Sequence, residues 1–248
     1  MNDRNQYTQR TVPDSFDVIG LANAFSTVDV TTTGGSTADY RRGEYFWEEV
    51  TVDNSSSPAW QGVTVTTSGG GSNPHGFVFV PKTPEQYNGG PSGAPTDADG
   101  NLSADGRWTY TWDAENRLIR LVARTATGPQ QRIDFSYDWQ GRRISKKVWS
   151  NTAGSGTPTL DRLFVYDGWN LVAELNATNK NVIRSYVWGL DLSGTEAGAG
   201  GVGGLLFSRP NGGDAQAVAY DGNGNVMGLC SMGDGTIGAR YEYGPFGE

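Results

Sequence analysis

One short unit recurs along the chain from residue 97 onward and constrains its fold more than any other feature of the sequence. The unit consists of an aromatic residue, Asp, two further residues, Gly or Asn, and then polar and apolar residues. Its copies lie at 112–118, 137–144, 166–172 and 220–226, and a copy without the aromatic residue lies at 97–102. Because each copy of an internal repeat forms one supersecondary unit, the pattern predicts a row of similar elements.

The polar positions of each copy have the chemistry of a tight turn. An Asp side chain accepts hydrogen bonds from backbone amides ahead of it, and Gly or Asn three residues later tolerates a positive φ. This combination is typical of a hairpin loop that is built on a type I turn. The residues for which we predict this structural role are Asp97, Gly100, Asp113, Asn116, Asp138, Gly141, Asp167, Asn170, Asp221 and Gly224.

Aromatic residues alternate with other residues before these turns, as in Trp108-x-Tyr110-x-Trp112. Spacing of two places side chains on one face of a strand, so each unit is predicted to be a strand, a turn and a strand. We therefore expect an all-β protein whose repeated antiparallel hairpins form a curved, shell-like sheet. The aromatic residues that could stack on a ligand are Trp108, Tyr110, Trp112, Tyr137, Tyr166, Tyr186 and Trp188. The alternative, which we favour, is that these rings fill the core or an inner wall.

Composition agrees with strands and turns rather than helices. The chain of 248 residues contains 36 Gly, which breaks helices and supplies the positive φ of tight turns. The glycines have no three-residue period, which excludes collagen, and the 8 Trp, 11 Tyr and 9 Phe argue against disorder.

Three regions differ in their sequence patterns. We expect residues 1–30 to be poorly structured or flexible, although residues 14–28 give a weak helical signal. Residues 31–96 are predicted to be β-rich and to end in a Gly/Pro-rich linker, and residues 97–248 to form the hairpin region. The glycine-rich segment 194–213 matches no turn formula.

Charge and targeting signals bear on partners and location. The net charge of −8 argues against a phosphate-binding partner, so we predict no nucleic acid. No stretch is apolar over the length of a membrane span or a signal peptide, and Cys230, the single cysteine, excludes an internal disulfide. The open edges of a truncated sheet would allow self-association.

No motif for catalysis stands out. His75 is the only histidine and lies in a turn-like setting, and no Gly-x-Ser-x-Gly sequence is present. Carboxylates gather at 44–49 and at 113–115, but spacing alone does not bring them together. The match to Gly-x-Gly-x-x-Gly at 198–203 is not followed by a helical pattern. We predict no catalytic residue, no metal ligand and no cofactor, with a carboxylate-based hydrolase as an open alternative.

The copies DADGNL, WTYTWDAENRL, YDWQGRRI, VYDGWNLVAEL and YDGNGNV resemble the Tyr-Asp (YD) repeats of the rearrangement-hotspot (RHS) family. The resemblance covers about residues 97–248, and the final YEYGPFGE is similar to the segment just before that family's C-terminal core end. It implies a fragment of a β-shell that encloses a C-terminal toxin or effector domain. The expected partners are then the rest of the shell and the enclosed domain, and the parent protein is expected to be secreted or on the cell surface.

The predicted function is accordingly a structural one, as a non-catalytic segment of a shell wall. An alternative is a carbohydrate- or protein-binding module that uses exposed aromatic residues, with a glycan or a protein as its ligand.

Overall fold

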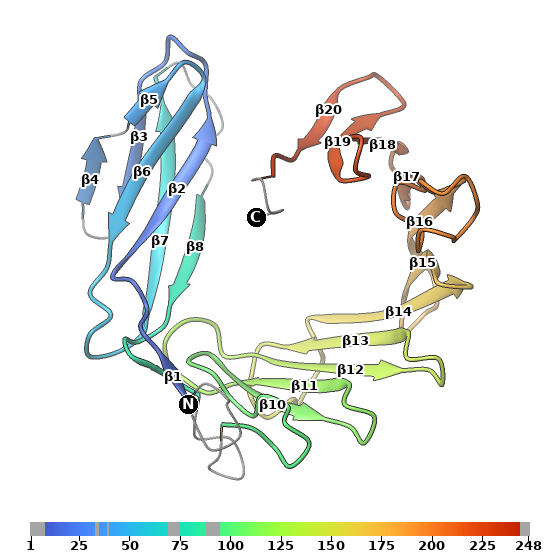
Figure 1. The fold of residues 1–248 in the computed structure, drawn as a ribbon, viewed down its shortest axis with the longest axis horizontal. Coiled ribbons are helices and arrows are strands. Elements are labelled where there is room, and N and C mark those ends of the chain that lie inside the picture. Colours follow the sequence, from blue (N-terminus) through green and yellow to red (C-terminus); the bar gives the residue numbers. More distant parts are fainter. Residues whose placement is uncertain (1–7, 33–34, 39, 69–74, 88–94, 244–248) are drawn as a thin grey trace. The chain divides into compact units, whose positions relative to one another are not determined.

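The chain is an all-β protein in its computed structural model (Figure 1). The structure describes residues 8–32, 35–38, 40–68, 75–87 and 95–243. These ranges contain strands, turns and no helix, which confirms the predicted fold class and shows that the helical signal at 14–28 is wrong. No helix in the described ranges has the length and apolar character that a membrane span requires.

The chain divides into two compact units. The first consists of residues 1–132 with 150–154, and the second of residues 133–149 with 155–248. Parts of the predicted linker and both chain ends, at 88–94, 1–7 and 244–248, lie outside the described residues.

Two antiparallel sheets form the main body of the first unit. One sheet has the order β2 (Ser15–Leu21), β6 (Tyr45–Thr51) and β5 (Tyr40–Arg42). The other has the order β4 (Gly35–Ala38), β3 (Val28–Thr32), β7 (Ala59–Thr67) and β8 (His75–Val80). A separate ribbon pairs β1 (Gln9–Arg10) with β9 (Glu85–Gln86).

Valine side chains from both sheets form one hydrophobic core. Val30 of β3 is fully buried, and Val50 of β6 and Val63 of β7 belong to the same cluster. In β6 the buried Phe46 and Val50 alternate with exposed residues, as expected for a strand with one face on a core. The first unit is thus stabilised by burial of apolar surface between two sheets.

The N-terminal segment contains strands where we expected little regular structure. Strand β2 pairs with β6 over its whole length, and β3 pairs with β7. Gly20 of β2 lies under the Phe46 ring, and a Cβ at this position would come within 2.5 Å of the ring. These strands depend on partners distant in the sequence, so no local pattern identifies them.

A meander of eleven strands follows, in which each strand pairs with the next along the chain. Its strands, in order, are β10 (Trp108–Trp112), β11 (Leu118–Ala123), β12 (Arg132–Tyr137), β13 (Arg143–Trp149), β14 (Leu160–Asp167), β15 (Asn170–Asn176), β16 (Val182–Trp188), β17 (Leu205–Pro210), β18 (Gln216–Tyr220), β19 (Val226–Ser231) and β20 (Ile237–Arg240). Neighbouring strands are antiparallel, which confirms the predicted repeated hairpins.

The second unit has almost no buried core of its own. Among its described residues, Trp149 is the single hydrophobic side chain that is buried. Apart from Trp149, Ser208 and Ser231, the strands of this unit present half-buried and exposed residues on both faces, so the sheet is a single layer there. Cross-strand pairs and turns therefore contribute a larger share of its stability than burial does.

Candidate functional site

An Asp side chain organises each of several turns between the strands of the meander. The Asp113 carboxylate accepts the backbone amides of Glu115 at 2.9 Å and Arg117 at 3.0 Å, and the Arg117 Nε atom at 2.8 Å. The bond from the Arg117 amide is the largest influence that lowers the pKa of Asp113. Asn116 has a φ of 60°, in the left-handed region. Asp138 makes the same set of bonds to Gln140 and Arg142.

Two other copies use an amide in place of the guanidinium. Asp97 accepts the backbone amide and the side-chain Nδ2 of Asn101, and Asp221 does the same with Asn225. In the three turns that have a glycine three residues after the Asp, this glycine has a positive φ. These angles are 94° at Gly100, 81° at Gly141 and 82° at Gly224.

The copy at Asp167 has a different geometry. Asp167 lies directly opposite Asn170 in the β14–β15 ladder, so the loop contains two residues. Gly168, with a φ of 55°, supplies the left-handed position that we expected at Asn170. A glycine immediately after the Asp permits this tighter hairpin turn, because it adopts positive φ without steric cost.

Side chains also connect one turn to the next. The Asn101 Nδ2 atom donates to Asn116 Oδ1 at 2.7 Å, which joins the first two turns. Arg142 donates to the carbonyl oxygen of Gly168, and its guanidinium lies 5.4 Å from the centre of the Tyr166 ring. Side chains therefore connect these four turns in two pairs.

Aromatic residues before three of the Asp turns, together with Trp188 and Tyr243, make a bond that we did not predict. In each case the hydroxyl or indole N–H group donates to the backbone carbonyl of a residue just after an earlier turn or loop. The five bonds are Trp112 to Leu102 at 2.8 Å, Tyr166 to Arg143 at 3.0 Å, Trp188 to Leu171 at 2.7 Å, Tyr220 to Leu205 at 2.7 Å and Tyr243 to Val226 at 2.9 Å. We call this set the back-bonds.

A signal for the back-bonds is present in the sequence. In the four copies that have an aromatic residue before the turn Asp, that residue is Tyr or Trp, whereas Phe occurs two residues earlier, at Phe135 and Phe164. Tyr and Trp differ from Phe in carrying a hydrogen-bond donor. The choice of residue at this position therefore indicates a bond and not merely a packed ring.

The predicted ligand-stacking residues are all half-buried. Besides the back-bonded Trp112, Tyr166 and Trp188, the hydroxyl groups of Tyr110 and Tyr186 donate to Asp105 and Glu174, respectively. Burial, followed by these bonds, raises the pKa of both hydroxyls. The Trp108 ring faces the Arg107 guanidinium at 4.9 Å, and Tyr137 ends β12 before the Asp138 turn. Stacking of these rings on a ligand stays a prediction.

Two other tryptophans are far more exposed. Trp139 is 87% exposed at the tip of the β12–β13 turn, and Trp169 is 64% exposed at the tip of the β14–β15 turn. Their turns are the two that Arg142 connects to each other. Neither residue is among the predicted ligand-stacking residues.

The glycine-rich segment folds around one buried carboxylate. Asp191 accepts the Ser193 hydroxyl at 2.6 Å and the backbone amides of Ala199 at 2.6 Å and Gly201 at 3.2 Å. The bond from the Ser193 hydroxyl is the main cause that lowers the pKa of Asp191 to about 2. Strand β17 follows this loop, whereas a dinucleotide site requires a helix there.

A second buried carboxylate connects the N-terminal ribbon to the first hairpins. Glu85 of β9 is 3% exposed and accepts the Arg10 Nε atom at 2.5 Å and the Gly106 amide at 2.8 Å. Nearby, Asp105 accepts the amides of Arg107 at 2.7 Å and Trp108 at 2.6 Å. Both carboxylates are thus bonded to groups of the protein itself.

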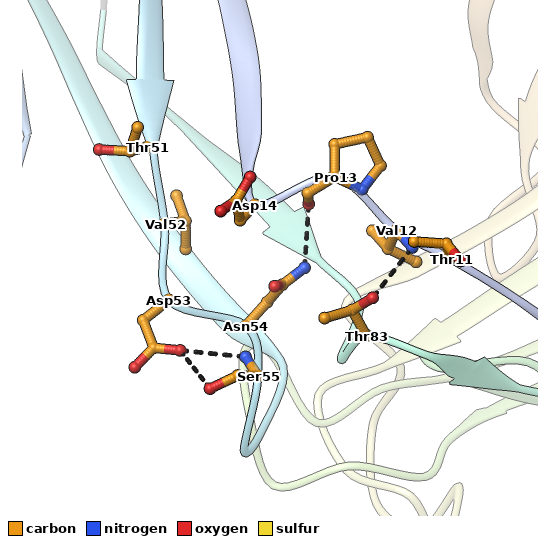
Figure 2. Close-up of a pocket in the computed structure, with 10 residues that line it drawn as sticks. All are labelled: Thr11, Val12, Pro13, Asp14, Thr51, Val52, Asp53, Asn54, Ser55 and Thr83. Atoms are coloured by element: carbon orange, nitrogen blue, oxygen red, sulfur yellow. Dashed lines mark hydrogen bonds between the residues drawn. The ribbon is translucent and has the colours of Figure 1, made fainter.

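A pocket of about 600 Å³ lies at one end of the two packed sheets. Figure 2 shows Asn54 reaching toward Pro13, while Asp53 is bonded to Ser55 on the pocket wall. Asn54 is 1% exposed, and its Nδ2 atom donates to the carbonyl oxygens of Pro13 and Pro81, both at 3.0 Å. Its Oδ1 atom is buried without a partner among the described residues, so this pocket offers a buried acceptor.

The remaining candidates for chemistry have structural environments. His75 begins strand β8, which corrects the expected turn, and its Nδ1 atom lies 2.7 Å from the Thr64 hydroxyl. Glu49 accepts the Ser15 hydroxyl, and Glu115 pairs with Arg117. In the described ranges, no group of three or more His, Cys, Asp or Glu residues is arranged to hold a metal ion.

Comparison with known proteins finds bacterial tRNA nucleases. Over 154 residues, 61% of this chain, the sequence is 30% identical to the tRNA3(Ser)-specific nuclease WapA of Bacillus spizizenii and 29% identical to the tRNA nuclease WapA of Bacillus subtilis strain 168. Over 95 residues, 38% of this chain, it is 37% identical to the tRNA(Glu)-specific nuclease WapA of Bacillus subtilis subsp. natto. The matched regions span only 4–6% of the length of these relatives. No protein-family model matches the chain.

These findings correct two predictions. The assignment to the RHS/YD-repeat family is wrong, because no family model matches and the relatives found are WapA tRNA nucleases. The prediction that excludes nucleic acid is also wrong, because the relatives are named for their action on tRNA. The prediction rested on the net charge of the whole chain, which conceals local differences. Residues 117–184 contain 11 Lys and Arg but only 5 Asp and Glu. Over 154 residues the chain is thus similar to a short part of much longer tRNA nucleases.

Proposed function

We propose that this chain is a non-catalytic structural segment of a larger toxin-type protein similar to the WapA nucleases, in which it helps to enclose a toxin or effector domain. The observation that supports the proposal is the series of back-bonds. In each, an aromatic side chain donates a hydrogen bond to the carbonyl oxygen of a residue just after an earlier turn or loop, as Tyr166 does to Arg143. Such a series fixes the register of successive hairpins.

The build of the second unit also supports a structural role. A single-layer sheet with almost no core of its own spans a large surface with few residues. In this unit the Asp turns and the back-bonds fix the positions of the strands, as a hydrophobic core does in the first unit. We propose further that catalysis belongs to another part of the parent protein, because the matched region is about 6% of two relatives. Secretion or surface display of the parent remains part of this proposal.

Two experiments test the function. The 248-residue chain, incubated alone with tRNA, is expected to leave the tRNA intact, and cleavage would overturn the non-catalytic assignment. In the parent protein, the double substitution Tyr166→Phe and Trp188→Phe removes two back-bond donors but keeps both rings. We expect it to increase protease cleavage of the enclosed domain. Tyr40→Phe, at a 66% exposed tyrosine, is the matched control. Equal protection in all three proteins would contradict enclosure by this segment.

A second candidate function is a binding module for a glycan or a protein. The observation that favours it is the exposure of Trp139 and Trp169 at adjacent turn tips. Exposed aromatic rings stack on sugars and on apolar protein surface. Trp139→Ala with Trp169→Ala should abolish binding on a glycan array or in a pull-down, whereas Trp47→Ala in β6 should not. Unchanged binding in the double variant would eliminate this candidate.

A further inference from the structure

The charges of this acidic chain are strongly segregated along the sequence. Residues 117–184 have a net charge of +6, from 11 basic and 5 acidic residues, whereas the rest of the chain has a net charge of −14. In the structure this basic segment forms strands from β11 to β16 of the meander. A protein with an acidic total charge therefore has a basic stretch of sheet.

Strand register and one ring contact place four of these cations on one face. Lys146 of β13 lies opposite Arg162 of β14, Phe164 lies opposite Glu174, and Glu174 lies opposite Arg184 of β16. Opposite residues point to the same face of a sheet, and so do residues two apart on one strand. Arg143 reaches the same face, because its guanidinium lies 5.1 Å from the Phe164 ring centre. We call Arg143, Lys146, Arg162 and Arg184 the cationic strip.

The strip contains a like-charge pair that the protein itself does not neutralise. Lys146 and Arg162 are direct cross-strand neighbours, an arrangement that destabilises a sheet. Among the described residues, neither side chain has an ion-pair partner. The acid on this face, Glu174, accepts the Tyr186 hydroxyl. Two adjacent half-buried cations without an ion pair in the described part of the chain make this face attractive to an anion from outside the chain.

Aromatic rings lie between the cations of the strip. The Arg143 guanidinium lies 5.4 Å from the Phe135 ring and 5.1 Å from the Phe164 ring. Arginine that is held over rings keeps its donors in a fixed plane for phosphate oxygens. A basic surface with interleaved aromatic groups is the typical platform for single-stranded nucleic acids, on which phosphates meet cations and bases stack.

We propose that the cationic strip binds the phosphate backbone of single-stranded RNA. Charge complementarity and the three arginines of the strip favour phosphate as the anion, since Arg matches phosphate geometry with two parallel hydrogen bonds. An acidic protein surface would complement the charge of the strip, but it would not require guanidinium groups that are held against aromatic rings. The proposal goes beyond the structural function above and does not depend on it.

The test compares two double variants of the full 248-residue chain that lose the same charge. Lys146→Gln with Arg162→Gln removes two cations of the strip. Lys82→Gln with Arg240→Gln removes two exposed cations outside it. Binding of a fluorescent oligouridylate of roughly 16 nucleotides is followed by anisotropy from about 50 mM salt upward.

We expect the strip variant to bind RNA about ten-fold more weakly at low salt. The slope of log K against log salt should fall by roughly 1.4, since each lost phosphate contact on a single strand removes about 0.7. The strip variant should melt no lower than the parent chain, because it relieves a like-charge pair. If it does unfold, Arg184→Gln tests the same face, with an expected fall in slope of about 0.7.

Three results would overturn the proposal. These are equal weakening in both double variants, no measurable RNA binding by the unaltered chain at low salt, and tighter binding of polyglutamate than of RNA. The last result would identify an acidic protein as the occupant. Failure of RNA binding would leave the protease test of the structural function unaffected.

Discussion

The indole Nε1 atom of Trp188 donates to the carbonyl oxygen of Leu171 at 2.7 Å, across 17 positions of the chain. Leu171 lies at the start of β15, just after one turn, and Trp188 ends β16, just before the next loop. The same relation recurs at four other positions of the meander. One hairpin is thereby held in register by a contact that begins in the next.

Removal of this donor should destabilise the sheet. In Trp188→Phe the ring stays but the Leu171 carbonyl loses its half-buried partner, so the free energy of unfolding should fall by about 1 kcal/mol. Chemical denaturation measures the change. Trp139→Phe, at a tryptophan that is 87% exposed, serves as the control and should alter stability by less than about 0.5 kcal/mol. Equal effects of the two substitutions would mean that the bond contributes nothing.

The turn glycines should resist substitution for a backbone reason alone. Gly141 has a φ of 81°, and a Cβ built there meets nothing within 4 Å. Gly141→Val should therefore cost about 1–3 kcal/mol from backbone strain without any steric clash. Gly76→Val in strand β8 also meets open space but has an ordinary φ, and it should have little effect. Equal melting temperatures of the two variants would contradict the turn geometry.

Arg107 should be a critical residue of the first unit. It is buried, donates to the carbonyl oxygens of Thr127 and Pro129, and lies against three aromatic rings. Arg107→Met removes these charge-assisted bonds and should lower the free energy of unfolding by about 3 kcal/mol. Arg107→Lys should recover little, because an ammonium group lacks the planar fork. Arg42→Met, at an exposed cation of β5, is the control; a similar loss there would refute the special role of Arg107.

Low pH should destabilise the folded state, because it protonates the Asp191 carboxylate. Folding lowers its pKa from about 3.9 in an unfolded chain to about 2, so the ionised carboxylate stabilises the folded state above about pH 4. This contribution is lost as the pH falls from about 4 to about 2. Denaturation at a series of pH values should show that Asp191→Asn loses stability at neutral pH and loses less on acidification. Asp17→Asn, at an exposed carboxylate, should follow the unaltered chain. A difference independent of pH would contradict the role of ionised Asp191.

The sequence predicts features that depend on neighbouring residues. Asp113 and Asn116 form a turn through bonds that span four positions, so their spacing alone specifies the geometry. The turn at Asp167 differs because Gly168 offers a second left-handed position nearby. Even this difference is local, and a comparison of the two glycine placements explains it.

Features that depend on contacts between distant residues cannot be predicted from local sequence patterns. Gly20 lies under Phe46 because β2 pairs with β6, and the residues of neither strand indicate which strand it pairs with. Asp191 acquires its ligands only when the chain turns back at Ala199 and Gly201. The cationic strip depends on register across several strands, whereas a total charge of −8 conceals it.

The order of strands in the meander has a consequence for how the chain acquires its structure. Every strand from β10 to β20 pairs with its neighbours in sequence, so these contacts have low contact order. Loop closure for each new hairpin involves only a short stretch of chain, and each completed hairpin is a template for the next. The meander can therefore assemble progressively as the polypeptide emerges from a ribosome or a narrow channel, whereas β2 must wait for β6.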